Sequence, residues 1–147
     1  MGSEKTVDLR EKLQRHLLKN KYEKLPGIKF KKILLSSEYT ENEDRETEYV
    51  FKTYSIPNER IDNSCDKEYL IAWMKEWVTP YLDKGHDVIL IDNGFGVQVT
   101  ILDTEKMLDF YINSKSHLGL SIINRSLKKF LNIQKEEYDF LFFIRDI

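Results

Sequence analysis

Hydrophobic residues that recur every three or four positions predict four helices in this chain of 147 residues, over residues 4–21, 66–83, 104–114 and 120–131. The first carries a leucine at every fourth position (Leu9, Leu13 and Leu17), and its other faces are rich in lysine and arginine. The second has the strongest pattern, because one stripe carries three large aromatic residues: Trp73, Trp77 and Tyr81. We expect this stripe to pack in the core rather than form an exposed anchor. Pro80 should either kink the helix or end it one turn early.

Alternating and branched apolar residues predict strands. Residues 28–36 and 48–56 should pair as a first hairpin, joined by a solvated loop with the sequence SEYTENEDRET. The alternation slips at Lys32-Ile33, which predicts either a β-bulge there or burial of the later part of the strand on both faces. The segment YDFLFFI near the C-terminus is ambiguous between strand and helix, and its density of aromatic residues favours a buried strand.

The sequence DNGFG at residues 92–96 separates two apolar runs and suggests either a phosphate-binding loop or a hairpin turn. A dinucleotide fingerprint needs a third glycine and a following helix, and a P-loop needs a Lys-Ser/Thr pair. Both are missing here, whereas Asn-Gly is the preferred pair for a type I′ turn. We therefore predict a second hairpin, in which Gly96 marks a bulge or tight packing. Its register would place Asp92 opposite Phe95, Leu90 opposite Val97 and Val88 opposite Val99.

These elements predict one α+β domain over residues 1–147, in the order α-β-β-α-β-β-α-α-(β). Its two hairpins would form a largely antiparallel sheet, with helices covering one face. No apolar run approaches the roughly 18 residues that span a bilayer, and the N-terminal residues lack a hydrophobic signal core. A single cysteine fits a reducing compartment. We therefore expect a cytoplasmic protein that makes no contact with a membrane.

Residues suited to catalysis or metal binding are sparse. Cys65 precedes Asp66, whose carboxylate would raise the pKa of a nearby thiol rather than activate it. The three histidines, His16, His86 and His117, have no metal-binding spacing, and no G-x-S-x-G motif is present. A pair of carboxylates of the glycosidase type is not distinguishable from solvated surface. We therefore predict no catalytic residue, no metal and no cofactor, and we favour a protein that is not an enzyme.

Charge is unevenly distributed along a chain whose net charge is only −2. Residues 5–32 carry ten basic and three acidic residues, a net charge of +7, whereas residues 38–48 carry one basic and six acidic residues, a net charge of −5. One explanation is that both segments are ordinary solvated surface, and it accounts for the charge as well as a functional role would. The alternative is that the acidic loop docks a basic partner or mimics the phosphates of a nucleic acid. The candidate partner-binding residues are Tyr39, Glu41, Glu43, Asp44 and Glu46, together with Asp92 and Phe95 beside the second turn.

Three hypotheses for function follow, in order of preference. The first is a non-enzymatic protein-binding module, an inhibitor of the toxin-immunity, antitoxin or phage-encoded type, whose acidic hairpin loop docks a basic protein. The second is a small-molecule or nucleotide-binding protein with a pocket between the second hairpin and its covering helices. The third is a nucleic-acid-binding regulator that uses the basic N-terminal helix, although the slightly acidic net charge argues against nucleic acid. The sequence leaves the oligomeric state open.

Overall fold

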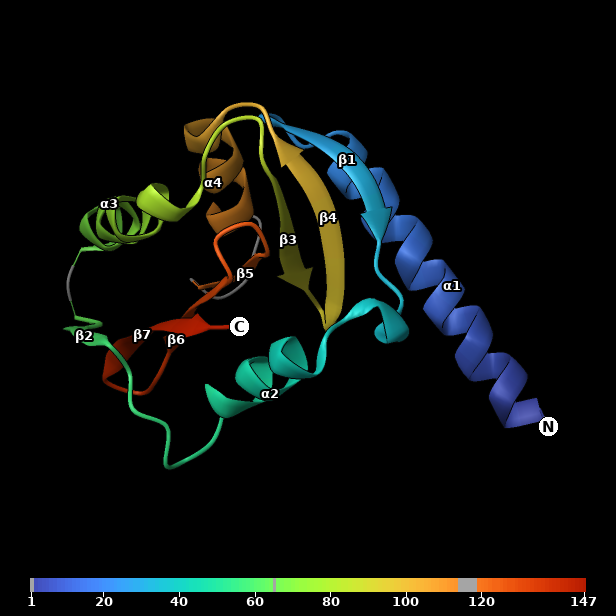
Figure 1. Cartoon of the computed structure of the whole chain (residues 1–147), viewed down its shortest axis with the longest axis horizontal. Helices are drawn as coiled ribbons and strands as arrows, with labels where there is room; N and C mark the ends of the chain where they lie inside the picture. Colours follow the sequence, from blue (N-terminus) through green and yellow to red (C-terminus); the bar gives the residue numbers. More distant parts are fainter. Residues whose placement is uncertain (1, 65, 114–118) are drawn as a thin grey trace.

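The computed structural model describes residues 2–64, 66–113 and 119–147, which form one α+β domain. Seven antiparallel strands make one sheet in the order β1-β4-β3-β5-β6-β7-β2 (Figure 1). The strands are β1 (Ile28–Ile33), β2 (Glu59–Asp62), β3 (Asp87–Asp92), β4 (Phe95–Ile101), β5 (Leu120–Asn124), β6 (Lys129–Lys135) and β7 (Asp139–Asp146). The helices are α1 (Gly2–Glu23), α2 (Glu41–Tyr49), α3 (Lys67–Val78) and α4 (Thr104–Asn113), with short 3₁₀ helices η1 (Ser36–Glu38) and η2 (Thr79–Tyr81). The predicted fold class is confirmed.

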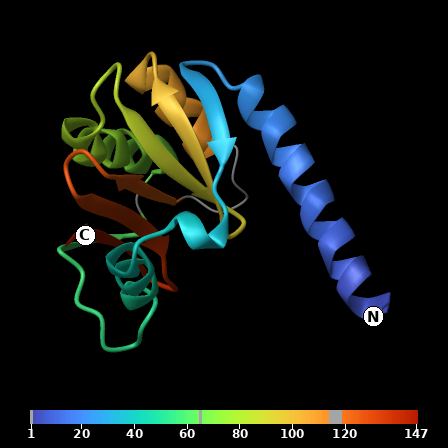
Figure 2. The same cartoon turned by 45° about the vertical axis from the view of Figure 1, so that its right-hand side comes forward.

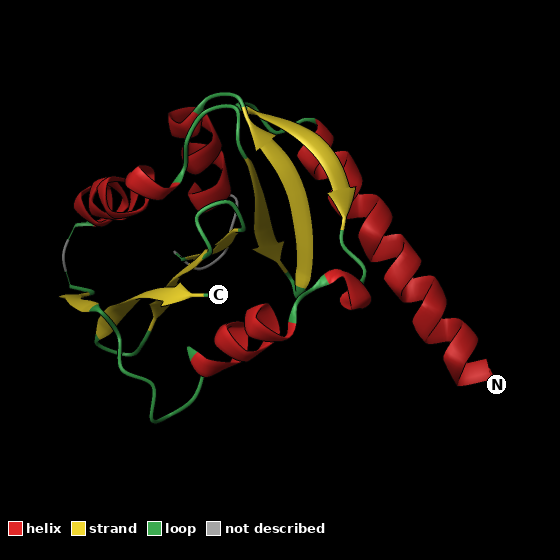
Figure 3. Cartoon of the chain, viewed as in Figure 1, coloured by secondary structure: helices red, strands yellow, loops and turns green. Residues whose placement is uncertain are grey.

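Helices lie on both faces of the sheet, whereas the sequence predicted a cover on one face only. On one face α1, α3 and α4 pack into the larger core, to which they contribute Tyr22, Met74 and Tyr111. On the other face α2 and its flanking segments bring Leu34 and Val50 against a smaller apolar cluster (Figure 3). Because both faces are covered, consecutive residues of the central strands are buried, as in β3 and β7.

The hairpin of β3 and β4 is confirmed, including its register. Asp92 pairs with Phe95, and the two further pairs of the predicted register are also present. Asn93 and Gly94 have φ angles of 49° and 82°, which are the positive values that a type I′ turn requires. In the sheet this hairpin lies between β1, the edge strand beside α1, and β5 (Figure 1).

The predicted first hairpin is wrong. β1 pairs with β4 rather than with residues 48–56, and β2 starts only at Glu59 and pairs with β7. Part of the expected loop is instead α2, because Thr40 and Glu43 form a capping box. The backbone N–H of Glu43 donates to the Thr40 hydroxyl at 3.1 Å, and the backbone N–H of Thr40 donates to the Glu43 carboxylate at 3.0 Å. Acidic residues in the first turn also favour this helix start.

The predicted bulge in β1 is present one residue before its expected place, because the register against β4 shifts between Phe30 and Lys32.

The helix predicted over residues 120–131 is wrong, since this segment forms β5, a turn and the start of β6. Consecutive residues of these strands are buried on opposite faces of the sheet: Ile122 belongs to the larger core and Ile123 to the smaller cluster. Burial on both faces produces a run of apolar residues that also fits helical spacing.

The remaining elements follow the sequence closely. α3 ends at Val78 and Pro80 lies in η2, so the early end is confirmed. The helix predicted over residues 104–114 is α4, which buries Met107, Leu108, Tyr111 and Ile112. The C-terminal aromatic segment is β7, so the preference for a strand is confirmed. Trp73 and Trp77 pack on the larger core in part-buried positions, with ring centroids 3.9 and 5.0 Å from that of Phe142.

α1 is the predicted N-terminal helix, but its leucine stripe does not enter the core. Leu18 and Tyr22 make the core contact near the C-terminal end of α1. The other leucines are each more than half exposed: Leu9, Leu13 and Leu17. Figure 2 shows the N-terminal part of α1 projecting past the body of the domain. Within the described ranges, no helix is both long and apolar enough to cross a lipid bilayer.

Candidate functional site

Two acidic side chains of α2 hold this helix on the sheet. Glu43 is 2 % exposed, and its carboxylate accepts hydrogen bonds from Nε and Nη2 of Arg125, at 2.7 and 2.8 Å. Arg125 lies just after β5 and also donates to the backbone carbonyl of Glu38. One turn further along α2, Glu46 accepts a hydrogen bond from Arg145 of β7 at 2.8 Å, while the guanidinium of Arg145 stacks on the Tyr49 ring. Glu43 and Glu46 therefore have structural partners within the domain.

The electrostatics of this anchor follow from its geometry. Burial acts to raise the pKa of Glu43, but hydrogen bonds from Arg125 and from the backbone of Thr40 outweigh burial and hold that pKa below its ordinary value. The hydrogen bond to Glu43 in turn raises the pKa of Arg125, so the charged form is favoured in both partners. The pair is therefore charged over the whole physiological pH range.

Tyr39 also has a structural position. Its hydroxyl lies against Gly96 of β4, where an added Cβ would be 2.0 Å from the tyrosine oxygen. Burial raises the pKa of the Tyr39 phenol, although a hydrogen bond with the Gly96 backbone opposes this effect. The expected tight packing at Gly96 is thereby confirmed, and its cause is the Tyr39 ring.

The outward side of α2 carries the other candidate acids. Glu41 and Asp44 are exposed, and Glu48 joins them at a spacing that places all three on one helix face. The chain then forms a compact segment, residues 50–56, that folds back on α2. The backbone N–H of Ile56 donates to the Tyr49 hydroxyl at 3.2 Å, and the rings of Tyr49 and Tyr54 meet edge to face.

This folded-back segment exposes three large apolar side chains, which are 66–75 % accessible: Phe51, Tyr54 and Ile56. We call these three, together with Glu41, Asp44 and Glu48, the acidic–apolar face. Exposed aromatic side chains next to charged residues are typical of protein-binding surfaces. The sequence analysis named two of these acids, Glu41 and Asp44. It missed the three apolar residues, because the composition of residues 48–56 is typical of a strand.

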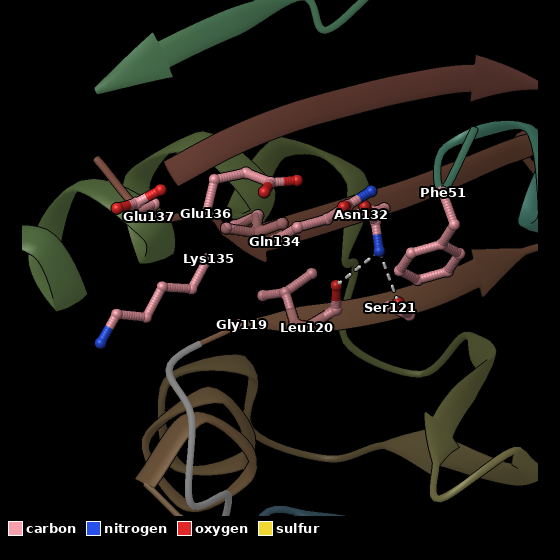
Figure 4. A pocket seen from close by; sticks show the side chains of 10 residues that line it. Phe51, Gly119, Leu120, Ser121, Asn132, Gln134, Lys135, Glu136 and Glu137 are labelled. Atoms are coloured by element: carbon pink, nitrogen blue, oxygen red, sulfur yellow. Dashed lines mark hydrogen bonds between the residues drawn. The ribbon is translucent and has the colours of Figure 1, made fainter. Parts of the chain in front are cut away.

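Phe51 stands between two hollows of the surface. One has a volume of about 400 Å³ and is bordered by Glu136, Glu137 and Tyr138. The other, about 660 Å³, lies over β5 and β6 and is shown in Figure 4. In its floor the Asn132 amide donates to the Ser121 hydroxyl at 2.8 Å. The carbonyl oxygen of Asn132 is buried and has no hydrogen-bond partner among the described residues.

Asp92 and Phe95 lie on the opposite face of the sheet, next to α1. The Asp92 carboxylate is largely buried and accepts hydrogen bonds from Lys21 Nζ and the Tyr22 hydroxyl, both at 2.8 Å. The guanidinium of Arg15 lies 5.4 Å from the centre of the Phe95 ring. These residues fix the direction of α1 and border a hollow of about 260 Å³. The structure therefore separates Asp92 and Phe95 from the acidic candidates instead of bringing them together.

Other candidate chemistry is limited. Cys65 and His117 lie outside the described residues, and His16 and His86 are exposed. Among the residues that the structure describes, no three histidine, cysteine, aspartate or glutamate side chains are grouped so that they could hold a metal ion. Comparison with known proteins found no family model, no curated protein and no solved structure that matches the chain.

Proposed function

We propose that this chain is a non-enzymatic protein-binding module whose docking surface is the acidic–apolar face. One observation carries the proposal: a segment held in shape by hydrogen bonds, next to a helix that is anchored by an ion pair, presents three large apolar side chains to solvent. Rigid aromatic groups beside a hollow supply binding energy, because they bury apolar area without a large loss of conformational entropy. The role of an inhibitor, of the toxin-immunity, antitoxin or phage-encoded type, is consistent with such a surface.

The chemistry of the surface defines the partner. Apolar side chains of the partner would pack beside Phe51 and Tyr54. Basic side chains around them would meet the exposed carboxylates of α2. The hollow beside Phe51 is bordered by charges of both signs, Glu136 and Glu137 together with Lys52 and Arg60, and so adds little net charge. The partner surface is therefore a basic, apolar one. Its binding should weaken as salt is added, because exposed charges are screened.

Photo-crosslinking in the native host tests this proposal. A photoreactive phenylalanine derivative at Tyr54 should capture one main protein, and the same group at Tyr69 of α3, which is also exposed, should not. The triple variant E41K/D44K/E48K should abolish the capture. The control variant E68K/E76K/D83K makes the same change of net charge on exposed acids elsewhere. Equal capture by wild type and by E41K/D44K/E48K would refute docking through this face.

A second candidate, small-molecule binding, is supported by the hollow in Figure 4. The buried Asn132 carbonyl oxygen would accept a hydrogen bond from an N–H or O–H group of a ligand, and the exposed Phe51 ring would cover a planar one. A thermal-shift screen with nucleobases and nucleosides tests it. A true ligand at roughly one hundred times its Kd should stabilise the domain by about 2.7 kcal/mol, and Phe51→Ser should remove that shift. A panel that gives no shift counts against this candidate.

A further inference from the structure

The leucine stripe of α1 is an apolar surface that the domain itself leaves uncovered. Its three leucines share one side of the helix, while the opposite side supplies Leu18 and Tyr22 to the core. Exposed leucines at this spacing are typical of a helix that docks in a groove or on another helix. A surface that covers these leucines would belong either to another molecule or to a part of the domain that α1 can reach.

The charge of α1 restricts what can cover the stripe. From Leu9 to Lys24 the chain carries six basic and two acidic residues, a net charge of +4. Arg10, Lys12 and Lys19 are exposed on the same helix. The covering surface should therefore combine apolar side chains with carboxylates.

The acidic–apolar face has this combination. The exposed charged residues of α2 are three acids, Glu41, Asp44 and Glu48, and one base, Arg45, a net charge of −2. The apolar side chains Phe51, Tyr54 and Ile56 follow α2 directly. The lengths also agree: Leu9–Leu17 and α2 are each nine residues long, and each spans about 14 Å at 1.5 Å per residue.

α1 cannot reach the acidic–apolar face of its own chain in the described arrangement. Its C-terminal half is tied down by the core contact of Tyr22, by the Lys21–Asp92 ion pair at 2.8 Å and by a hydrogen bond from Arg15 to the Leu34 carbonyl. These contacts direct α1 away from α2, and Figures 1 and 2 both show the two helices apart. The face that α1 fits is therefore available to it only on another molecule.

We propose that the chain forms a closed dimer in which α1 of each copy docks on the acidic–apolar face of the other. This inference rests on the proposed function, because it uses the same face as the binding surface for a basic, apolar helix. The reciprocal arrangement makes two equivalent contacts and so satisfies twofold symmetry. Direct pairing of two α1 helices would instead bring two segments of charge +4 together, which is unfavourable.

Sedimentation equilibrium and light scattering of the full-length chain test the dimer. Wild type should dimerise at low salt, and added salt should weaken the association. Leu13→Glu on α1 and the face variant E41K/D44K/E48K should each raise the dissociation constant by about tenfold or more, since about 1.4 kcal/mol corresponds to tenfold. The control variant E68K/E76K/D83K should dimerise like wild type. Circular dichroism of each variant establishes that it is folded.

A charge exchange gives the decisive measurement. The arm variant R10E/K12E/K19E and the face variant should each be monomeric alone, because each places like charges at both contacts. Mixed together they should form a heterodimer, because an acidic arm then meets a basic face and a basic arm meets an acidic face. Failure of the mixture to associate, or a monomeric wild type at every concentration, would overturn the dimer.

Other occupants of the stripe give different results. Dimerisation that survives the face variant and strengthens with salt indicates pairing between two α1 helices, and so contradicts the proposal. Binding of the monomer to vesicles of anionic lipid, lost in Leu13→Glu, indicates a membrane surface and also contradicts it. A monomeric chain whose crosslinked partner disappears in the face variant would overturn only the dimer. A dimer that forms as described, with no separate partner at Tyr54, would instead remove the inhibitor role.

Discussion

The ion pair between Glu43 and Arg125 should be the main attachment of α2, and Glu43→Gln tests this. Glutamine has nearly the same shape and can still accept the hydrogen bond at the third position of the capping box. It has no charge, and its amide N–H groups cannot accept from the guanidinium. The substitution therefore removes the ion pair while it leaves the helix start largely intact.

The decrease in the free energy of unfolding that we expect for Glu43→Gln lies between two limits. Removing one member of a fully buried ion pair costs roughly 3–5 kcal/mol, whereas an exposed pair is worth about 0–1 kcal/mol. Here the Glu43 side chain is 2 % exposed and that of Arg125 is 42 % exposed, so water can partly solvate the guanidinium that remains. We therefore expect Glu43→Gln to lower the free energy of unfolding by about 2–3 kcal/mol at neutral pH.

Urea unfolding followed by circular dichroism measures this loss, and its pH dependence identifies the cause. The pKa of Glu43 is lower in the folded protein than its ordinary value of 4.5. Its charge therefore stabilises the fold fully above pH 4.5, and the contribution disappears as pH falls through the lower, folded-state pKa. The difference between wild type and Glu43→Gln should shrink over this acid range. The exposed neighbour Glu41→Gln should stay within about 0.5 kcal/mol of wild type. A loss for Glu43→Gln that is equally small, or that persists unchanged in acid, would contradict the reasoning.

Three further pairs of substitutions probe the packing and the β3–β4 turn, each by urea or thermal unfolding. Gly96→Ala should cost about 1–3 kcal/mol, because its Cβ would lie 2.0 Å from the Tyr39 hydroxyl, and adding Tyr39→Phe should recover part of that loss; no loss at all would mean that Tyr39 does not pack there. Leu18→Ala should cost at least about 2 kcal/mol, whereas Leu13→Ala on the exposed stripe should change stability by less than about 0.5 kcal/mol; equal effects would place the stripe in the core. Asn93→Ala should cost about 1 kcal/mol, because alanine disfavours a positive φ, and Asn93→Gly should be tolerated; the reverse order would exclude the type I′ turn.

Local signals explain which elements could be predicted. The β3–β4 hairpin depends on a two-residue turn, and Asn93-Gly94 is a strong preference that tertiary contacts reinforce. The helix α2 had an equally local signal, since Thr40 and Glu43 fit the capping-box pattern. The density of charge between residues 38 and 48 led instead to a solvated loop. The error therefore came from weighing overall polarity above the signal for a helix start.

The helix predicted over residues 120–131 failed for a different reason. Its apolar residues are spaced for one helix face, but the structure distributes them over both faces of two neighbouring strands. A strand that is buried on both sides loses the alternation by which it would be recognised. The cover that α2 and its flanking segments form on the second face explains the pattern, and those contacts join residues that are far apart in the sequence.

The candidate site was predictable only in part. The sequence indicates the acidic segment, but it cannot assign Arg125 to Glu43 or Arg145 to Glu46, because these partners lie 82 and 99 residues further along the chain. Two of the proposed docking acids are therefore structural anchors. Conversely, the composition of residues 48–56 suggests burial, and only the structure shows that Phe51 and its apolar neighbours are exposed.

The two edges of the sheet affect how the chain behaves at high concentration. β1 forms one edge, with lysines at positions 29, 31 and 32 and a bulge after Phe30, and β2 forms the other as a strand of only four residues with charged side chains. Lysines, bulges and short strands all hinder the addition of another chain to a sheet edge. The three lysines of β1 thus protect this edge against aggregation. The molecule can expose apolar groups on α1 and beside α2 and still avoid stacking into fibrils.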